Sequence, residues 1–477
     1  MKYEQVIGLE VHCELKTKSK MFSSSPVSFA KTPNTMVNEI DFSMPGIMPS
    51  VNKKAVEYAL RVCHALHMEI DDLICFDRKN YYYSDLPKGF QITQQQRPIG
   101  KNGYLDIIVD NQKKRIEIER LHMEEDTAKQ THFDDYTLID YNRAGIPLIE
   151  IVTKPVLRNG KEAAIYLEKL RQIVLYTEVS DAKLEEGSMR CDINLSLRPI
   201  GSKQLGVRTE IKNLNSISNV QKAIEYEASR QEKILLSKKE VIQETRRYDE
   251  GLRKTVLMRS KGNSVDYKYY SEPNILPIRL SQKWIKSIKN HLNMMPDVRE
   301  DLYIHKYHLS SIDAKKIVSS KELSDFFNET VLLSQHYQII CNWLLGDVLA
   351  YLNKHHLKLN QTLLTPSYLS TLINLIEEEV ISSKQAKQVF EIMMKEGKDP
   401  RIIIEEKNMK QISNKEELTS IINQILDKNT ESLIDYFHGK DRVIGYLVGQ
   451  IMKETRGQAN PKSTNELLIQ LLEERKG

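Results

Sequence analysis

The stretch Ser188-Met-Arg-Cys-Asp-Ile-Asn-Leu-Ser196 alternates polar and apolar residues, and Val207-Arg-Thr-Glu-Ile-Lys-Asn-Leu-Asn215 repeats the alternation. Successive side chains of a β-strand point to opposite faces, so each stretch predicts a strand with one polar and one apolar face. The link between them, 199–206, holds a proline and two glycines and is typical of a turn. We therefore expect an antiparallel hairpin.

The polar face of this hairpin carries an unusual set of charges. If the hairpin folds about its middle, Asp192 lies opposite Glu210, and Arg190 lies opposite Lys212. Like charges directly across a strand pair are destabilising, so such a face suits a divalent metal ion and a phosphate better than packing. An exposed acidic strand face is nevertheless often only solvated surface, and each strand taken alone leaves that alternative open.

Two further segments repeat the pattern of an apolar face backed by acids. In 6–15, Glu10 and His12 share one face, while the residues between them are apolar. The segment 104–126 predicts a second hairpin that turns over 111–114 and ends in three consecutive acids. An oxygen-rich set with one imidazole favours magnesium or manganese over zinc. The candidate metal ligands are Glu10, His12, Glu124, Glu125, Asp192 and Glu210.

Bulk composition describes a globular protein of two or three domains. The chain has 477 residues, 40% hydrophobic and 28% charged, with a formal charge of only +4. No run approaches 18 apolar residues and the N-terminus lacks a signal-peptide core, so we expect a cytoplasmic protein without a membrane span. Five cysteines form no Cys-x-x-Cys pair, which indicates free thiols, buried in the case of Cys13 and Cys191, and argues against zinc.

The order of elements predicts an α+β fold in three parts. Residues 1–292 hold the strand signals, 293–405 read as an all-helical domain, and 406–477 as a small helical tail. Within the last two parts, Thr365-Pro366 predicts a helix start. In the first part, amphipathic helices are expected over 51–68, 159–177 and 215–238.

Two other stretches have the composition of nucleic-acid contacts. The segment 76–90 interleaves aromatic residues with Lys79 and Lys88, so it suits base stacking and phosphate contact, or else is an ordinary aromatic strand and turn. The segment 438–462 has five Lys/Arg against two acids and suits an RNA backbone or a solvated helix end. The phosphate-binding motifs G-x-x-x-x-G-K-[ST] and G-x-G-x-x-G are absent, which excludes P-loop and Rossmann sites.

Long motifs in the chain resemble one family over essentially its whole length: the B subunits of tRNA-dependent amidotransferases (GatB). The matching runs include Gly8-Leu-Glu-Val-His12, Phe76-Asp-Arg-Lys-Asn-Tyr81, Leu121-His-Met-Glu-Glu-Asp126, Asp140-Tyr-Asn-Arg-Ala-Gly-Ile-Pro147, Glu185-Glu-Gly-Ser-Met-Arg-Cys-Asp192, Arg208-Thr-Glu-Ile-Lys-Asn-Leu-Asn-Ser216, Glu244-Thr-Arg-Arg247, Asn342-Trp-Leu-Leu-Gly-Asp347 and Val448-Gly-Gln-Ile-Met-Lys453.

This resemblance implies a "cradle" domain, related in fold to the glutamine synthetase catalytic core, then a helical domain and a tail that contacts tRNA. It implies a cytoplasmic heterotrimer with an amidase (GatA-type) chain and a small third (GatC-type) chain. The complex would use ATP, Mg²⁺ (or Mn²⁺) and glutamine-derived ammonia to convert misacylated Glu-tRNA(Gln), Asp-tRNA(Asn) or both into the correct amide form. Many members carry a cysteine-rich zinc knuckle near the first strand, whereas this chain reads Phe22-Ser-Ser-Ser-Pro26, so no zinc is expected.

Carried over by motif, the resemblance assigns the catalytic and metal-binding roles to five positions, with Glu124 a sixth metal ligand. Phosphate contacts are expected from Lys79, Lys88, Arg190 and Lys212. Two rival hypotheses stay open: a tRNA-binding scaffold whose acidic face is inactive, and a stand-alone ligase for a small amide. The five positions are Glu10, His12, Glu125, Asp192 and Glu210.

Overall fold

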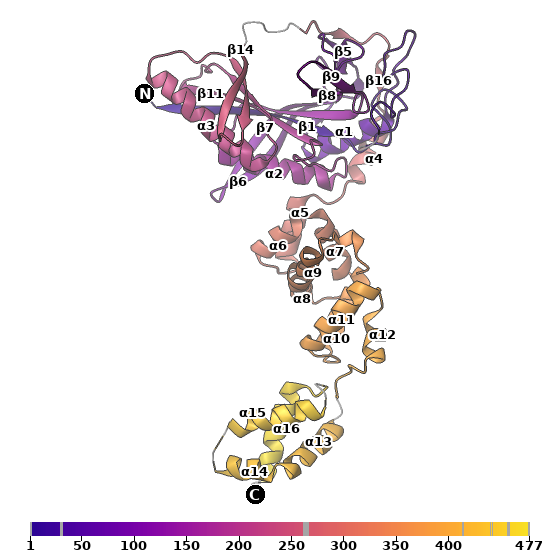
Figure 1. Ribbon diagram of the computed structural model, residues 1–477, viewed down its shortest axis with the longest axis vertical. Helices are drawn as coiled ribbons and strands as arrows, with labels where there is room; N and C mark the ends of the chain where they lie inside the picture. Colours follow the sequence, from indigo (N-terminus) through magenta and orange to yellow (C-terminus); the bar gives the residue numbers. More distant parts are fainter. Residues whose placement is uncertain are drawn as a thin grey trace. The chain divides into compact units, whose positions relative to one another are not determined.

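The computed structural model divides the chain into two compact units, Met1–Pro296 and Asp297–Gly477. The first unit is a mixed α+β domain built on a large sheet, and the second is helical (Figure 1). The predicted border between helical domain and tail, at 405, stays a prediction. The structure describes residues 2–28, 32–260, 267–412, 415–438, 440, 442–455 and 458–475.

A large sheet dominates the first unit. Its strand order within the described residues is β14-β13-β12-β11-β1-β10-β7-β6-β2, and neighbouring strands are antiparallel except for β12 and β13. Smaller sheets are formed by β15-β4-β5, by β16-β3 and by β8-β9. The strands are β1 (Tyr3–Glu14), β2 (Glu69–Ile70), β3 (Leu73–Ile74), β4 (Asp77–Asn80), β5 (Phe90–Thr93), β6 (Gly100–Val109), β7 (Gln112–Glu125), β8 (Lys129–His132), β9 (Thr137–Asp140), β10 (Pro147–Thr153), β11 (Met189–Pro199), β12 (Thr209–Lys212), β13 (Glu244–Asp249), β14 (Lys254–Ser260), β15 (Tyr270–Ser271) and β16 (Ile278–Arg279).

Helices cover the apolar face of the large sheet, and the three predicted helices of this unit are confirmed within a few residues. Each begins at a polar N-cap whose side chain accepts backbone N–H groups: Asn52 for α1, Asn159 for α2 and Ser216 for α3. Figure 1 shows α2 and α3 along the same side of the sheet. The helices are α1 (Lys53–Ala65), α2 (Gly160–Tyr176), α3 (Ile217–Leu236) and α4 (Gln282–Asn290).

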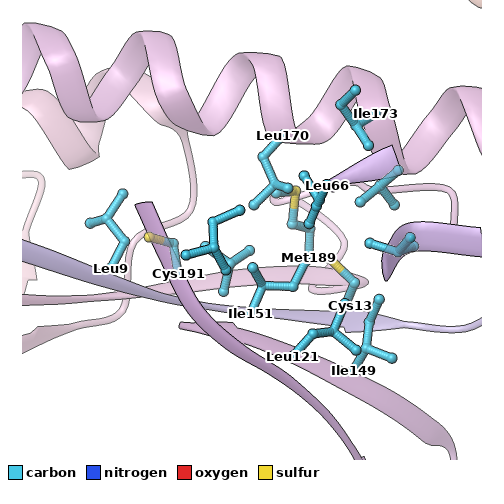
Figure 2. Close-up of a cluster of buried hydrophobic side chains, with 14 of the residues drawn as sticks. Leu9, Cys13, Leu66, Leu121, Ile149, Ile151, Leu170, Ile173, Met189 and Cys191 are labelled. Atoms are coloured by element: carbon cyan, nitrogen blue, oxygen red, sulfur yellow. The ribbon is translucent and has the colours of Figure 1, made fainter. Parts of the chain in front are cut away.

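The core lies between this face and the helices. Figure 2 shows side chains from four neighbouring strands meeting Leu170 and Ile173 of α2. Burial of apolar surface on this scale is the main stabilising contribution to the unit and fixes which face each strand turns away from solvent. Cys13 and Cys191 lie in this core as free, buried thiols, which confirms the prediction. Because the apolar faces are held here, the alternate residues of β1, β7, β10 and β11 emerge on the opposite face.

The β11–β12 hairpin forms as predicted, but its register was predicted wrongly. Asn194, not Asp192, lies opposite Glu210, since the hairpin does not fold about its middle. The shift of two residues keeps every side chain on its expected face, because the strand period is two. It also removes the predicted like-charge pairs: Lys212 now forms an ion pair with Asp192.

The turn of the second predicted hairpin is shorter than expected. Val109 pairs with Gln112, so only Asp110 and Asn111 form the turn, in place of 111–114. Both residues have positive φ, 49° and 61°. Two-residue turns with positive φ at both positions match the twist of the flanking strands, and Asp and Asn tolerate this conformation.

In the described residues of the second unit the regular elements are helices, and an isolated β-bridge joins Ile412 and Ala459. Pro366 lies in the first turn of α10 behind the N-cap Thr365, as predicted. Leu426, Leu447 and Leu468 are fully buried in a separate apolar core toward the C-terminus. No helix in the described part of the chain is long and apolar enough to cross a membrane. The elements are α5 (Pro296–His305), α6 (Ser311–Val318), α7 (Lys321–Val331), α8 (Tyr337–Trp343), the π-helix η1 (Leu344–Val348), α9 (Leu349–His355), the 3₁₀ turn η2 (Leu359–Gln361), α10 (Pro366–Glu377), α11 (Ser383–Glu396), α12 (Pro400–Glu406), α13 (Lys415–Lys428), α14 (Thr430–Phe437), α15 (Arg442–Glu454) and α16 (Pro461–Glu474).

Candidate active site

The face of the large sheet opposite the helices is lined with ionisable side chains. Residues paired across neighbouring strands share a face. Glu10 of β1 pairs with Asp192 of β11, and His12 of β1 pairs with Glu150 of β10. Glu150 in turn pairs with His122 of β7. With Glu210 of β12, which pairs with Asn194 of β11, five strands therefore bring charged groups together on one surface, in two clusters.

The first, which we call the histidine–glutamate cluster, consists of His12, His122, Glu124 and Glu150. Glu150 is its centre, since one of its oxygens lies 3.3 Å from His12 Nε2 and 3.2 Å from His122 Nε2. Glu124 approaches the same two imidazoles at 3.5 and 3.6 Å. The prediction named His12 and Glu124, whereas Glu150 and His122 were not foreseen.

Burial and charge act against each other in this cluster. Burial by itself lowers the pKa of His12 and of His122, but the carboxylates of Glu150 and Glu124 outweigh it. The net effect raises the pKa of His12 and raises that of His122 to about 9. Burial raises the pKa of Glu150, yet the two imidazoles hold it well below its usual range. In the metal-free cluster both imidazoles thus keep their protons to a higher pH than an ordinary histidine does.

The second, the carboxylate cluster, consists of Glu10, Asp192 and Glu210. Lys212 lies among them, bonded to Asp192 and with its Nζ 3.1 Å from a Glu210 oxygen. Asn194 donates a hydrogen bond of 2.8 Å to Glu10. These contacts fix the carboxylate orientations and balance part of their charge.

The electrostatics of this cluster reflect an excess of negative charge. Burial and then the Glu150 carboxylate raise the pKa of Glu10, with further contributions from Asp192 and Glu210. Burial would lower the pKa of Lys212, but Asp192 and Glu210 raise it overall, so the ammonium stays charged. A cation held among carboxylates is a position from which charge on a substrate phosphate can be neutralised.

Glu125 lies apart from both clusters. Its side chain accepts the backbone N–H of Ile92 at 3.0 Å and forms an ion pair with Lys88 at 2.7 Å. This pair lines a cavity of about 160 Å³. Glu125 and Lys88 thus bind each other. Neither side chain joins the two clusters that hold the other predicted metal ligands. Other charged residues that line the cavity are Asp41, Arg78, Asp85, Asp126 and Glu272.

The remaining predicted phosphate contacts lie at the borders of the site. Arg190 forms an ion pair with Asp126 at 2.7 Å. Lys79 lies over the ring of Tyr267, 4.8 Å from its centroid, and 5.7 Å from that of Tyr81. Burial would lower the pKa of Lys79, but Glu124, Tyr269 and Glu150 raise it overall.

Each cluster contains a set of donors that fits a divalent cation. One ligand atom each from His12, Glu124 and Glu150 lie within 4.8 Å of one another, and so do those from Glu10, Asp192 and Glu210. Hard oxygen donors with at most one imidazole are the ligands of Mg²⁺ and Mn²⁺. In addition, His122 Nδ1 is buried without a hydrogen-bond partner in the described part of the chain. The contacts within the cluster therefore leave one polar atom unsatisfied.

Two signals for the missed residues are present in the sequence. Glu150 is the single charged residue of β10, Pro-Leu-Ile-Glu-Ile-Val-Thr, and a lone acid in a buried strand requires a partner. His122 lies two residues before Glu124, on the same face. Asn194 and Thr245, which bonds Glu210 at 2.9 Å, are neutral and give no comparable signal.

The basic stretch near the C-terminus is described only in part. Lys440 pairs with Asp435 at 2.8 Å, and Lys453 lies in the last turn of α15. Its role toward RNA stays a prediction. Gly439, Asp441, Arg456 and Gly457 lie outside the described residues.

Comparison with known proteins finds matches along nearly the whole chain. Residues 5–286 match the model of the GatB/GatE catalytic domain, and residues 325–472 match that of the GatB domain. The B subunit of the aspartyl/glutamyl-tRNA(Asn/Gln) amidotransferase of Mesoplasma florum is 49% identical over 472 residues, covering 99% of this chain and 98% of its own length. The proteins of the same name from Oceanobacillus iheyensis and Bacillus cytotoxicus are 49% and 50% identical, with full coverage of both chains.

Proposed function

The chain belongs to the family of aspartyl/glutamyl-tRNA(Asn/Gln) amidotransferase B subunits, and from this membership we propose that it is the activating component of a glutamine-dependent amidotransferase. The substrate is Glu-tRNA(Gln), Asp-tRNA(Asn) or both. The reaction is an ATP-dependent amidation of the side-chain carboxylate. The observation that carries the proposal is the placement of the carboxylate and histidine–glutamate clusters on one sheet face, with Lys212 among the carboxylates.

The chemistry explains why such a face is needed. A carboxylate does not release oxide to ammonia at neutral pH, so it must first become an acyl phosphate. A carboxylate oxygen of the aminoacyl group attacks the γ-phosphorus of ATP, and ADP departs with the electron pair of the broken P–O bond. Ammonia then attacks the acyl carbon, loses a proton and expels inorganic phosphate. The first step places negative charge on the transferring phosphoryl group, which cations must neutralise.

The two clusters would hold the metal ions of this reaction. His12, Glu124 and Glu150 form one donor set, and the carboxylate cluster forms the other. A bound Mg²⁺ would neutralise negative charge on the phosphates of ATP. Lys212 supplies a fixed positive charge beside them.

Outer contacts of the chain hold these groups in place. Asn194 and Thr245 each fix one carboxylate of the carboxylate cluster by a hydrogen bond. Residues that orient ligands in this way commonly change metal affinity or activity by about 10- to 100-fold when removed. Arg190, anchored on Asp126, and Lys79, held between tyrosine rings, are positioned to attract the phosphates of ATP or of the RNA.

The finer parts of the proposal concern the setting of this reaction. The partners are an amidase (GatA-type) chain, which releases ammonia from glutamine, and a small GatC-type chain, in a cytoplasmic heterotrimer. The large sheet corresponds to the catalytic core of glutamine synthetase.

Two rival functions are disfavoured by particular observations. Glu150 is a buried carboxylate that contacts two imidazoles at the centre of a metal-donor set. A tRNA-binding scaffold without activity would not need such a residue. A stand-alone ligase for a small amide has no need for the helical second unit, whose residues 325–472 match the GatB domain.

The experiment that tests the proposal measures ATP cleavage by the reconstituted complex with Mg²⁺ and either Glu-tRNA(Gln) or uncharged tRNA. Stimulation by the charged tRNA alone, reduced at least about 100-fold in Asp192→Ala with assembly intact, supports it. Asp135→Ala, at an exposed loop position, is the matched control. Cleavage that ignores the aminoacyl group, or that survives Asp192→Ala, contradicts the proposal and favours a tRNA-binding scaffold.

A further inference from the structure

A buried carboxylate that the proposed mechanism does not use lies on the helix-covered side of the large sheet. Glu227 belongs to α3, and none of its side chain is exposed. Arg230 of α3 donates to both of its oxygens, at 2.7 and 3.0 Å, and Arg246 Nε of β13 lies 3.6 Å away. Apolar side chains of similar volume often stabilise such a place equally well, so the retained charge points to a task of orientation.

Glu227 lies where α3 meets three neighbouring strands. The Thr255 hydroxyl of β14 donates to it at 2.8 Å. Gln231 of α3 donates to Glu227 at 3.1 Å and to the Thr209 hydroxyl of β12 at 3.1 Å. Arg246 of β13 donates to the Thr255 hydroxyl and to the Thr255 carbonyl, both at 3.0 Å. We call this group the α3 network: Thr209, Glu227, Arg230, Gln231, Glu244, which accepts from Arg246 at 2.6 Å, Arg246 and Thr255.

The strands at this end of the sheet have few backbone pairs to fix their register. β12 pairs with β11 over three residue pairs, and its other neighbour is the parallel strand β13. Between Thr245 and Arg246 of β13 the pairing with β14 shifts by one residue, at Met258, as in a β-bulge. A slip of one residue in such a strand turns each side chain to the opposite face. Side-chain contacts are therefore needed to hold β12 and β13 in register.

The α3 network and the carboxylate cluster lie on opposite faces of the same two strands. Across β12 and β13, Glu210 pairs with Thr245, and Ile211 pairs with Arg246. Ile211 is fully buried in the core, so Arg246 points to the helix-covered face and Thr245 to the other. The Thr245 hydroxyl donates to Glu210 at 2.9 Å. An Arg246 side chain anchored on Glu227 therefore fixes its neighbour Thr245, and through it Glu210.

Thr209 makes a second link between α3 and the carboxylate cluster. It is fully buried, its hydroxyl accepts from Gln231, and the next residue, Glu210, emerges on the opposite face. Gln231 also donates to the carbonyl of Leu195 at 3.4 Å, and Leu195 is the β11 partner of Thr209. One helix thus holds β11 and β12 together directly beside Glu210.

We propose that Glu227 is a positioning residue of the carboxylate cluster: through the α3 network it sets the register of β12 and β13, and thereby the approach of Glu210 to a bound divalent cation. This inference rests on the proposed function and deepens it, since it names the group that holds one of the two donor sets in shape. The histidine–glutamate cluster lies on β1, β7 and β10, to which the network makes no hydrogen bond among the described residues. Its metal affinity should therefore be independent of Glu227.

The first test measures Mn²⁺ binding by the reconstituted complex without ATP or tRNA. With His12→Ala in the background, the carboxylate cluster is the intact one of the two donor sets, and with Asp192→Asn the histidine–glutamate cluster is. Glu227→Gln should weaken Mn²⁺ binding about tenfold in the first background and by less than about twofold in the second, since residues that orient ligands commonly contribute about 10- to 100-fold. Calorimetric titration measures both. Glu232→Gln is the matched control, because Glu232 is exposed on the same helix.

The Mg²⁺ dependence of ATP cleavage gives a second readout. In Glu227→Gln the Mg²⁺ concentration at half-maximal cleavage should rise about tenfold, in line with the change in Mn²⁺ affinity. Cleavage should recover at saturating Mg²⁺, and KM for the charged tRNA should stay unchanged. A general weakening of the fold would instead lower kcat at every Mg²⁺ concentration, and that result would contradict the inference.

A double variant separates positioning from stability. Glu227→Leu/Arg246→Met removes the pair without leaving a buried charge, so it should regain most of the thermal stability that Glu227→Gln loses. Its Mn²⁺ binding in the His12→Ala background should nevertheless stay weak, because apolar side chains do not hold β13 in register. Recovery of Mn²⁺ affinity together with stability would show that the network serves the fold alone.

The same titrations distinguish failure of this inference from failure of the proposed function. Normal Mn²⁺ binding that Glu227→Gln leaves unchanged would overturn the inference alone, and so would an equal loss in both backgrounds. Absence of Mn²⁺ binding by the unmodified complex would overturn the proposed metal sites, and the inference with them. A loss confined to the His12→Ala background, in which the carboxylate cluster is intact, would establish Glu227 as its positioning residue.

Discussion

His12 and Glu150 face each other across β1 and β10 with Nε2 3.3 Å from the carboxylate, and His122 approaches the same oxygen from β7 at 3.2 Å. One carboxylate thus serves two imidazoles in a buried setting. The pairing depends on sheet register alone, since each of the three side chains is the direct cross-strand neighbour of the next. A substitution at Glu150 should therefore change the pKa of both histidines.

Replacement of Glu150 by Gln should lower the pKa of His122 from about 9 toward or below its ordinary value of 6.5. Burial favours the neutral imidazole, and the Glu150 charge is the largest factor that opposes it. NMR titration of the histidine ring protons in the metal-free protein measures this change. Glu117→Gln is the control, because its exposed carboxylate pairs only with Lys154 among the contacts described. An unmoved His122 pKa would contradict the assignment of Glu150 as the centre of the cluster.

The affinity of the histidine–glutamate cluster for Mn²⁺ or Mg²⁺ should rise with pH over the range in which His12 loses its proton. The carboxylates of Glu150 and Glu124 raise the pKa of His12, so its imidazole keeps its proton to a higher pH than an ordinary histidine, and a metal ion binds only the neutral ring. Calorimetry in buffers of different ionisation enthalpy should detect proton release on binding. Binding without proton release, or weaker binding at higher pH, would exclude His12 as a ligand.

The raised pKa of His122 also predicts how the stability of the metal-free protein changes with pH. A histidine whose folded pKa exceeds the unfolded value stabilises the fold fully below pH 6.5, and this contribution is lost as pH rises through the folded pKa, about 9 for His122. Thermal unfolding of the first unit within the full chain should therefore occur at lower temperature as pH rises from 6.5 to 9. Saturating Mn²⁺ should reverse the trend. In Glu150→Gln the pH dependence should weaken.

Lys88→Met should destabilise the region around β5 by about 3 kcal/mol, because it leaves the Glu125 carboxylate buried without its cation. Only 4% of the Glu125 side chain is exposed. The double variant Lys88→Met/Glu125→Gln should recover much of the loss, since no charge is then left unpaired. Hydrogen exchange at the Ile92 N–H, which donates to Glu125, gives a local measure. A double variant as unstable as the sum of the two single variants would mean that the pair is not coupled.

Much of the fold followed from period-two alternation. The polar and apolar faces of β1, β7 and β11 were predictable, because burial of one face fixes the orientation of every side chain in the strand. The order of the strands was not, since it depends on contacts between segments more than a hundred residues apart. For that reason Glu150, which is meaningful only beside β1 and β7, escaped notice, whereas Glu10, His12 and Asp192 were found.

The errors in register have the same origin. A symmetric hairpin was expected between 188 and 215, but the pairing register is shifted by two residues, and this replaces the like-charge pairs by the Lys212–Asp192 ion pair. The sequence alone gives no loop geometry for so long a connection. Glu125 was misplaced for another reason: consecutive strand residues point to opposite faces, so Glu124 and Glu125 could not both lie on the same face. β5, which receives Glu125, was not predicted as a strand.

Lys212→Met should strengthen Mg²⁺ binding in the absence of ATP and weaken ATP-dependent turnover. Lys212 is the cation that offsets the carboxylate cluster, and its removal leaves three carboxylates whose mutual repulsion a divalent ion relieves. The same removal withdraws a positive charge from the transferring phosphoryl group, so kcat should fall about 100-fold while KM for the charged tRNA changes little. Lys113→Met is the control, because its side chain is exposed and pairs with Asp106 far along β6 and β7. Weaker Mg²⁺ binding in Lys212→Met would show that the lysine supports the metal site, and a kcat within about threefold of the unmodified enzyme would remove Lys212 from the phosphate contacts.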